Sequence, residues 1–271
     1  AGFTAEASEY FNNNSSGKGF DIESLGYWNM GLANSSLLSV ASGGNHSAIA
    51  SWLGRVNYAY KGKYLASVSF RADGSSKFAK NNKWGYFPSA ALGWRISEED
   101  FMKDISWIQN LKLRVSYGET GSQAITAYQS LASFSTTSYV LNGSSAVALV
   151  PGRVPNPDLK WETTKQTDIG IDLSVLGGRI SLVADYYYKK TSDLLLEAPI
   201  PGTSGLNTIM RNIGSVQNQG FELTLNTHNI QTDNFNWMST VLFNVNRNKI
   251  LNLGERTRPL KRLNTTAFRE T

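Results

Sequence analysis

Asp168 and Asp172 have the spacing of two carboxylates on one face of a secondary-structure element. The residues around them alternate between polar and apolar types, which predicts a β-strand. Four positions along a strand place the two side chains roughly 13 Å apart, at about 3.3 Å per residue. A glycosidase needs its two carboxyl groups about 5–9.5 Å apart. We therefore expect no acid–base pair here and no catalytic residue.

Charged residues recur on the polar faces of other alternating segments. The set consists of Arg71, Arg95, Arg114, Asp168, Asp172, Asp185 and Glu222. Two interpretations are open: these side chains line a wet lumen and touch a substrate, or they form ion pairs that hold a wall or a plug. We favour the ion pairs.

Aromatic residues in or beside long connections are the candidates for ligand binding: Trp84, Tyr128, Tyr139 and Trp161. A flat ring can stack on the apolar face of a sugar while the polar rim of the sugar stays hydrogen-bonded. The alternative is that these rings pack within the connections or contact a partner protein.

Several classes of chemistry are excluded by residue types. The chain has no cysteine, which excludes disulfides and thiolate metal sites. His46 and His228 lie far apart and match no zinc pattern, and no phosphate-binding or nucleophile motif is present. We therefore expect no metal and no cofactor. The net charge of +5 is spread along the chain without a dense basic block, so we expect no nucleic-acid partner.

The elements that carry these residues are predicted from alternation with a period of two. Eight segments show it clearly, and a weaker ninth covers residues 2–9. The eight are 52–60, 64–73, 86–96, 111–118, 165–175, 179–190, 221–226 and 235–247. One apolar and one polar face fit a soluble β-sandwich, and they also fit a membrane barrel with lipid outside and water inside.

The lengths of the connections favour the barrel. Short connections are expected at 61–63, 176–178 and 229–234, and a somewhat longer one at 98–110, where Ser97 is a plausible helix N-cap. Long connections are expected at 10–45, 74–85, 119–164 and 191–218. Short and long connections alternate strictly, which places all tight turns at one end of an up-and-down sheet, as in outer-membrane barrels.

Aromatic residues also collect near the strand ends. One group is Tyr58, Tyr60, Tyr64, Phe235 and Trp237, and the other is Trp84, Tyr86, Tyr117, Trp161 and Tyr186 to Tyr188. Two such bands are typical of the aromatic girdles at the two membrane interfaces. Ordinary aromatic enrichment in strands is the alternative.

These observations predict an all-β fold: part of an antiparallel, up-and-down transmembrane β-barrel. Of the 271 residues, 41% are hydrophobic but only 17% are charged, against roughly 25% in an ordinary soluble domain. About nine strands are visible, whereas a closed bacterial barrel has an even number. We interpret residues 1–271 as one partial barrel, with the irregular basic segment 248–271 beginning another long loop.

A series of segments resembles one family. The series comprises SWLGRVNY (51–58), YKGKY (60–64), FRADGSSKF (70–78), WGYFPS (84–89), GWRIS (93–97), LRVSYG (113–118), TGSQ (120–123), NPDLKWE (156–162), DYY (185–187), KTSDLL (190–195), NIGSV (212–216) and NQGFELTL (218–225). Together they are similar to TonB-dependent transporters of the SusC/RagA type, over roughly residues 51–253.

This resemblance implies a Gram-negative outer-membrane importer with a barrel of about 22 strands and a plugged lumen. It also implies a glycan or peptide substrate, a surface lipoprotein of the SusD type as partner, energy supplied through TonB, and surrounding membrane lipid. A plug domain, a TonB-contacting region and a closing strand have no counterpart in the chain, so we place it in the middle of a barrel.

The expected function is import of a nutrient, a glycan before a peptide, without enzymatic activity. A soluble β-sandwich that binds carbohydrate or acts as an adhesin is the alternative. A smaller stand-alone porin or outer-membrane enzyme is a third.

Overall fold

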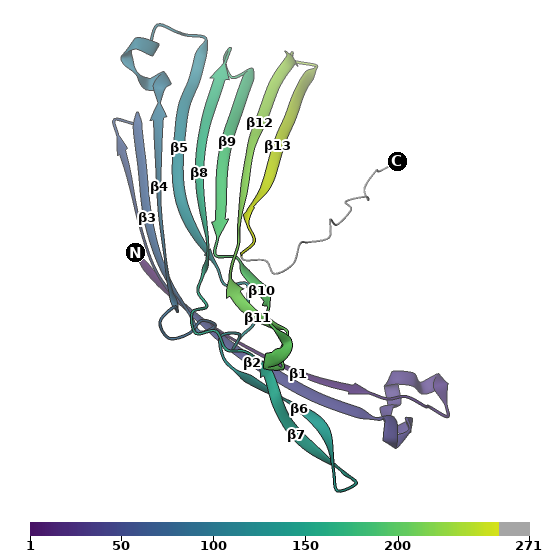
Figure 1. Cartoon of the computed structure of the whole chain (residues 1–271). Helices are drawn as coiled ribbons and strands as arrows, with labels where there is room; N and C mark the ends of the chain where they lie inside the picture. The colour runs from purple at the N-terminus through teal and green to yellow at the C-terminus, as the bar shows by residue number, and fades with distance from the viewer. Residues whose placement is uncertain (255–271) are drawn as a thin grey trace.

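The computed structural model describes residues 1–254 and shows one long, strongly curved antiparallel sheet (Figure 1). Its nine strands follow the order β1-β2-β3-β4-β5-β8-β9-β12-β13, so every neighbour in the sheet is also the next main strand in the chain. The nine predicted strands are therefore confirmed, and so is the up-and-down connectivity. We interpreted residues 248–271 as the beginning of a loop, and residues 255–271 of that segment lie outside the described part of the chain.

The main strands are longer than the alternating segments in the sequence. Their bounds are β1 Gly2–Ser16, β2 Ser39–Tyr60, β3 Tyr64–Ser75, β4 Trp84–Arg95, β5 Ile108–Ser122, β8 Glu162–Val175, β9 Ile180–Ser192, β12 Ser215–Gln231 and β13 Asn236–Asn252. Because β13 continues to Asn252, the first residues of the expected loop at 248 are strand.

All short connections lie at one end of the sheet, the upper end in Figure 1. Lys61 and Gly62, between β2 and β3, have φ of 52° and 67°. The turn between β8 and β9 likewise uses Leu176, Gly177 and Gly178 at positive φ. Glycine adopts this left-handed backbone without a steric penalty, which lets the chain reverse within a few residues.

The connection between β4 and β5 corrects one detail. It contains two short 3-10 segments, η3 Ile96–Glu98 and η4 Asp100–Met102. The prediction of Ser97 as an N-cap is wrong, because Ser97 lies inside η3 and its buried Oγ has no hydrogen-bond partner among the described residues. The backbone geometry that a cap requires falls on Arg95 and Glu99 instead.

Three of the four long connections contain further strands. The expected loop 10–45 is partly a two-stranded arm, because β1 and β2 stay paired out to Ser16 and Ser39, with the 3-10 segments η1 Glu23–Leu32 and η2 Ser35–Leu37 beyond them. Strands β6 Ser133–Leu141 and β7 Ser144–Arg153 form a hairpin, as do β10 Leu195–Pro199 and β11 Thr208–Asn212; η5 Gly202–Ser204 joins the second pair. Figure 1 shows the arm and both hairpins at the lower end.

The two faces of the sheet differ in character. One carries large apolar side chains that remain exposed, such as Val56 at 71% and Leu92 at 64%. The other carries the charged residues described below. No helix within residues 1–254 is long and apolar enough to cross a membrane.

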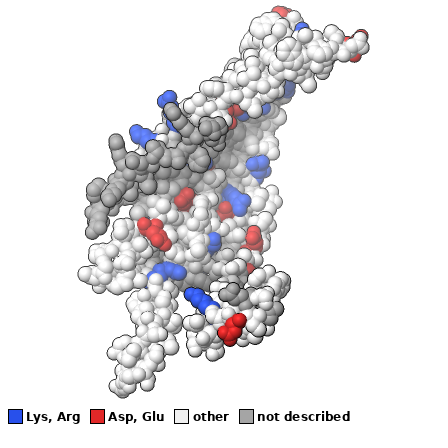
Figure 2. Space-filling model, turned by 90° about the vertical axis from the view of Figure 1, so that its right-hand side faces the viewer, with Lys and Arg blue, Asp and Glu red and all other residues white. Residues whose placement is uncertain are grey.

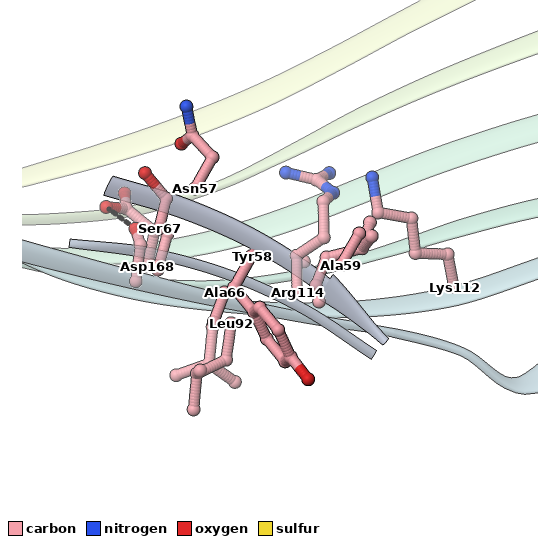
Figure 3. Close-up of a pocket in the computed structure, with 15 residues that line it drawn as sticks. Asn57, Tyr58, Ala59, Ala66, Ser67, Leu92, Lys112, Arg114 and Asp168 are labelled. Carbon is pink, nitrogen blue, oxygen red and sulfur yellow. Dashed lines mark hydrogen bonds between the residues drawn. The ribbon is translucent and has the colours of Figure 1, made fainter. Parts of the chain in front are cut away.

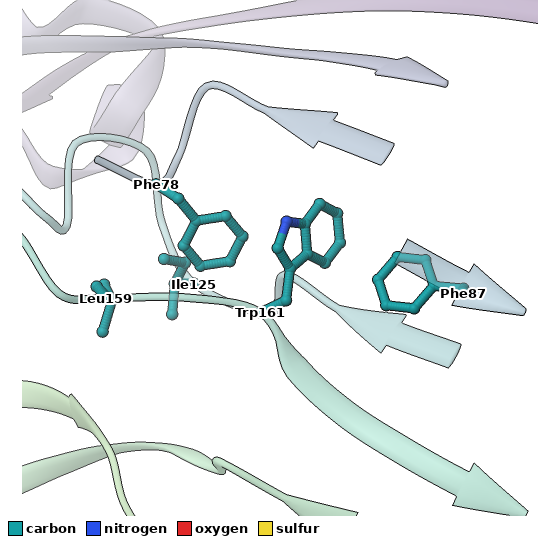
Figure 4. Close-up of a cluster of buried hydrophobic side chains, with 5 residues drawn as sticks. All are labelled: Phe78, Phe87, Ile125, Leu159 and Trp161. Atoms are coloured by element: carbon teal, nitrogen blue, oxygen red, sulfur yellow. The ribbon is translucent and has the colours of Figure 1, made fainter. Parts of the chain in front are cut away.

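A small hydrophobic cluster holds the lower end together. It consists of Phe78, Phe87, Ile125, Leu159 and Trp161, drawn from β4 and from the connections after β3 and β5 (Figure 4). The Phe87 ring lies over Gly85 and Gly121, where an added Cβ would come within 2.5 and 2.0 Å of its Cζ. These two glycines leave the space into which Phe87 packs.

Candidate functional site

The charged face is organised around Arg114 in the middle of β5. Arg114 Nε donates to Asp172 Oδ1 on β8 at 3.0 Å, and Arg114 Nη2 donates to Asp185 Oδ1 on β9 at 2.9 Å. Lys112 Nζ lies 3.7 Å from Asp172 Oδ2. One guanidinium thus joins three strands through charge-assisted hydrogen bonds, which are stronger than neutral ones.

Gly170 makes this bridge possible. It faces Arg114 on β5 and Asp185 on β9 in the sheet register, so the bridge passes directly over it. A Cβ at position 170 would lie 2.1 Å from Asp185 Oδ1 and 2.7 Å from Arg114 Nη2. Both distances are below any normal contact, so a larger residue would displace the ion pair.

The remaining charged residues lie on the same face in the cross-strand register. Arg71 pairs with Asp73 at 2.6 Å, and Arg95 pairs with Glu98 at 2.7 Å beside the short connections. Asp168 accepts from Ser116 Oγ at 3.1 Å and from Gln166 Nε2 at 2.8 Å. Glu222 faces Asp185 across the β9–β12 pair.

Two hollows adjoin Arg114 on the sheet. The first, of about 510 Å³, is bounded by β2, β3, β4, β5 and β8. Figure 3 shows Asn57, Arg114 and Lys112 on one side of the ribbon there, and Tyr58 and Leu92 on the other. The second, of about 690 Å³, is lined by polar side chains. They are Arg114, Ser116, Gln166, Asp168, Asp185, Tyr187, Lys189, Asn218, Glu222 and Asn246.

The chemistry of this face is hydrogen bonding rather than catalysis. Acidic and basic side chains are interspersed over the middle of the side shown in Figure 2. Asp172 is bound by Arg114 while Asp168 is bound by Ser116 and Gln166, so the two carboxylates have separate partners. No group of three potential metal ligands occurs among residues 1–254.

The four candidate aromatics have different surroundings. Trp84, Tyr128 and Tyr139 are 46%, 46% and 58% exposed. Trp161 is only 6% exposed, and its ring packs against Phe78 and Phe87 with centroid distances of 5.2 and 5.6 Å. The exposed ring expected at Trp161, in a ligand site or in a girdle, is therefore absent. Its Nε1 donates to the carbonyl of Lys83 at 2.9 Å, which fixes it in the cluster.

Tyr128 and Tyr139 lie at the base of the β6–β7 hairpin and on the hairpin itself. Tyr128 has a positive φ of 63°, its hydroxyl accepts from the His46 N–H at 3.1 Å, and its carbonyl accepts from Arg153 at 2.6 Å. It thereby ties the arm of β2 to the base of the β6–β7 hairpin. Tyr139 lies on that hairpin, which carries no charged residue from 133 to 152 and projects at the bottom of Figure 2.

Sequence reasoning missed a cluster at the opposite end. Glu99, in the connection between β4 and β5, accepts from Tyr64 Oη at 2.7 Å, Trp94 Nε1 at 3.0 Å and Lys63 Nζ at 3.0 Å. These three hydrogen bonds, led by that of Tyr64, lower the pKa of Glu99 to about 2. The cluster fastens two neighbouring short connections, and only the spacing of Tyr, Lys and Trp around two turns could have signalled it.

The fold and the two faces define the class. An up-and-down sheet with an exposed apolar face, a charged inner face and tight turns at one end is the wall of a membrane-spanning β-barrel. A family model described as "TonB dependent receptor-like, beta-barrel" matches residues 2–265, and the chain belongs to this family.

Curated relatives agree with this assignment. The chain is 48% identical over 206 residues to TonB-dependent receptor P26 of Formosa agariphila, which covers 76% of this chain and 21% of the relative. It is 39% identical over 219 residues to TonB-dependent receptor SusC of Bacteroides thetaiotaomicron, with the same two shares. The chain thus spans about a fifth of the length of the relatives it matches.

Solved structures place the fold. The RagAB peptide transporter superposes with a TM-score of 0.81 at 29% identity, covering 93% of this chain and 28% of the other. Its "open-open" state gives a TM-score of 0.82 at 29% identity, covering 97% and 29%. The chain is therefore a segment of a SusC/RagA-like receptor barrel, located in the outer membrane of a Gram-negative bacterium. This excludes the soluble β-sandwich and the enzyme alternatives.

Proposed function

We propose that this chain forms part of the wall and outer loops of a TonB-dependent importer that takes a nutrient across the outer membrane. The observation that carries the proposal is the two-faced wall: apolar residues point to one side, and the Arg114 bridge and its polar neighbours point to the other. A wall of this kind separates lipid from a wet interior. Membership in the receptor family supports the same role.

Transport through such a wall is a matter of binding and gating, not of bond chemistry. Substrate is captured at the end of the barrel that carries the long connections. It passes inward along the polar face when a plug within the barrel moves. Energy comes through TonB, and a surface lipoprotein of the SusD type covers the mouth. The similarity to the RagAB peptide transporter supports the expectation of a partner.

The cargo we propose is an oligosaccharide. Two exposed aromatic rings, Tyr128 and Tyr139, lie beyond the strand ends that carry the long connections. Such rings bind sugar faces by covering their C–H groups. Trp84 pairs with Gly74 in the register and so shares the apolar face of Leu92. The charged face supplies both hydrogen-bond donors and acceptors, which match sugar hydroxyls. A peptide is the second candidate, favoured by the 29% identity to the RagAB peptide transporter.

Deletion of the complete gene in its host tests the proposal. Growth on defined glycans and on peptide mixtures is compared between the deletion strain and the parent, with and without a protonophore. Loss of growth on one glycan, reproduced in the parent by the protonophore, supports oligosaccharide import. Loss on peptides alone supports the second candidate, and unchanged growth on every nutrient contradicts both.

A further inference from the structure

A third hollow, of about 590 Å³, lies on the charged face of β1, β2 and β3, toward the end of the sheet that carries the long connections. Four hydroxyl groups line it, contributed by Thr4 and Ser8 of β1 and by Ser47 and Ser51 of β2. Glu6, Arg71, Lys77 and Gln123 complete the polar lining. Its apolar lining consists of Ala5, Ala48 and Ile49, so most of the surface is made of hydrogen-bonding groups.

Three polar groups of this hollow, Arg71, Lys77 and Gln123, are held in place before any ligand enters. Ser75, 1% exposed, hydrogen-bonds through its hydroxyl to Gln123 Oε1 and accepts from the Lys77 N–H at 3.2 Å. Lys77 Nζ donates to the Gln123 carbonyl at 3.4 Å. Arg71 is fixed by Asp73 at 2.6 Å and by Ser51 Oγ at 3.2 Å. Such preorganisation reduces the entropy lost on binding.

The charges of the hollow cancel. Asp73 neutralises Arg71, which leaves one cation, Lys77, and one carboxylate, Glu6. Neither Lys77 nor Glu6 forms an ion pair within residues 1–254, although both line the same hollow. A net anionic ligand gains nothing from such a balance. A neutral ligand that both donates and accepts can bridge the two groups.

We propose that this hollow is a subsite for one neutral sugar residue of the cargo. Glu6 accepts a hydrogen bond from one sugar hydroxyl, Lys77 donates one to the oxygen of a neighbouring hydroxyl, and the Gln123 amide and the hydroxyls of Thr4, Ser8 and Ser47 bind the rest. A hydroxyl is donor and acceptor at once, so adjacent hydroxyls satisfy both charged groups. The inference rests on the proposed oligosaccharide cargo and adds the residues that bind it.

The experiment uses the receptor expressed from its complete gene and purified in detergent. A printed array of plant, algal and microbial glycans, together with a peptide array, identifies what binds. Calorimetry with the strongest-binding glycan then compares the wild type with Glu6→Gln and Lys77→Met. Two matched controls are Glu9→Gln, three residues along β1 on its other face, and Lys80→Met, in the same connection as Lys77 but outside the hollow.

We expect Glu6→Gln and Lys77→Met each to weaken glycan binding about tenfold or more, because each removes a charge-assisted hydrogen bond. The controls should bind within about twofold of wild type, as expected where no contact is removed. Unchanged affinity in both hollow variants overturns the subsite while leaving oligosaccharide import intact. Binding of peptides alone, or of nothing on either array, overturns the proposed cargo and the subsite with it.

Discussion

Arg114 shows how one residue type fixes the inner face of the wall. Its side chain is 35% exposed, and those of Asp172 and Asp185 are 23% and 29% exposed, so the bridge is partly withdrawn from water but not buried. Partly buried pairs are screened less than surface pairs, and their geometry depends on space around the guanidinium. At Arg114 that space is the missing side chain of Gly170.

We expect Gly170→Ala to destabilise the folded receptor by about 1–3 kcal/mol, the usual cost of overpacking. The added methyl displaces Asp185 from Arg114, because it would lie 2.1 Å from Asp185 Oδ1. Gly54→Ala is the control, since nothing lies within 4 Å of its added Cβ. Urea unfolding in detergent measures both, and equal midpoints for the two variants would show that Gly170 is not required for the bridge.

Glu99 gives a pH prediction at the short-connection end. Its pKa of about 2 in the folded state lies below the ordinary value of 4.5, so its stabilisation is complete above the ordinary pKa and is lost as the pH falls through about 2. We expect Glu99→Gln to be less stable than wild type at pH 6, and the difference to shrink between about pH 4.5 and 2. Heat-induced band shifts at each pH measure this difference; one that is unchanged at pH 2 would contradict it.

At the scale of the strand, alternation in the sequence predicted the strands that have one apolar and one polar face. Strands such as β8 and β9 separate an apolar face from a polar face, so each leaves a period-two signal. The outer parts of β1 and β2, from Tyr10 and Asn45 outward, are exposed on both faces and rich in Asn, Ser and Gly. With neither face buried, no alternation is required, and these strands were predicted as loop.

The sequence likewise predicted part of the candidate site: the face on which its charged residues lie, but not the contacts between distant segments. Strand parity placed Arg114, Asp172 and Asp185 on one face, and the structure adds that they touch. Parity cannot predict that Trp161 is buried, because Trp161 packs on Phe78 and Phe87 from other parts of the chain. The hollow of Glu6, Lys77 and Gln123 was missed because three distant segments meet there.

Adjacent residues on β8 test the assignment of the two faces. Ile171→Arg puts a charge on the apolar face and should cost about 2–4 kcal/mol if the position lies near the midplane. Asp172→Asn should cost less, because Arg114 keeps Asp185 as a partner. Unfolding in lipid vesicles compares the two variants of the complete receptor. Equal tolerance of both changes would contradict the assignment.

The hydrophobic cluster below the sheet gives a separate prediction. Phe87→Ala should cost about 3–5 kcal/mol locally, as expected for a large-to-small change in a packed core. The loss falls on the long connections that meet there, so limited proteolysis should cut residues 76–83, 123–132 and 154–161 faster while the strands of the main sheet remain protected. Phe70→Ala, on an exposed apolar position of β3, is the control. Equal cleavage of both variants would show that the cluster does not hold these connections.

At the scale of the whole molecule, the sheet is open. Strands β1 and β13 end the strand order, so each has one edge unpaired within the described residues. Unpaired edges invite further pairing, and the chain spans only about a fifth of its curated relatives. We expect both edges to pair with neighbouring strands in the complete receptor, which places the charged face toward an enclosed lumen.

The central claim is that one face of this sheet contacts lipid and the other contacts water. The chain has no native cysteine, so single cysteines at 65 to 70 on β3 can each carry a spin label in the complete, otherwise cysteine-free receptor in vesicles. We predict that Ala66, Val68 and Phe70 positions are accessible to oxygen, and Leu65, Ser67 and Ser69 positions to a polar nickel chelate. Equal accessibility to the chelate on both faces would contradict the account.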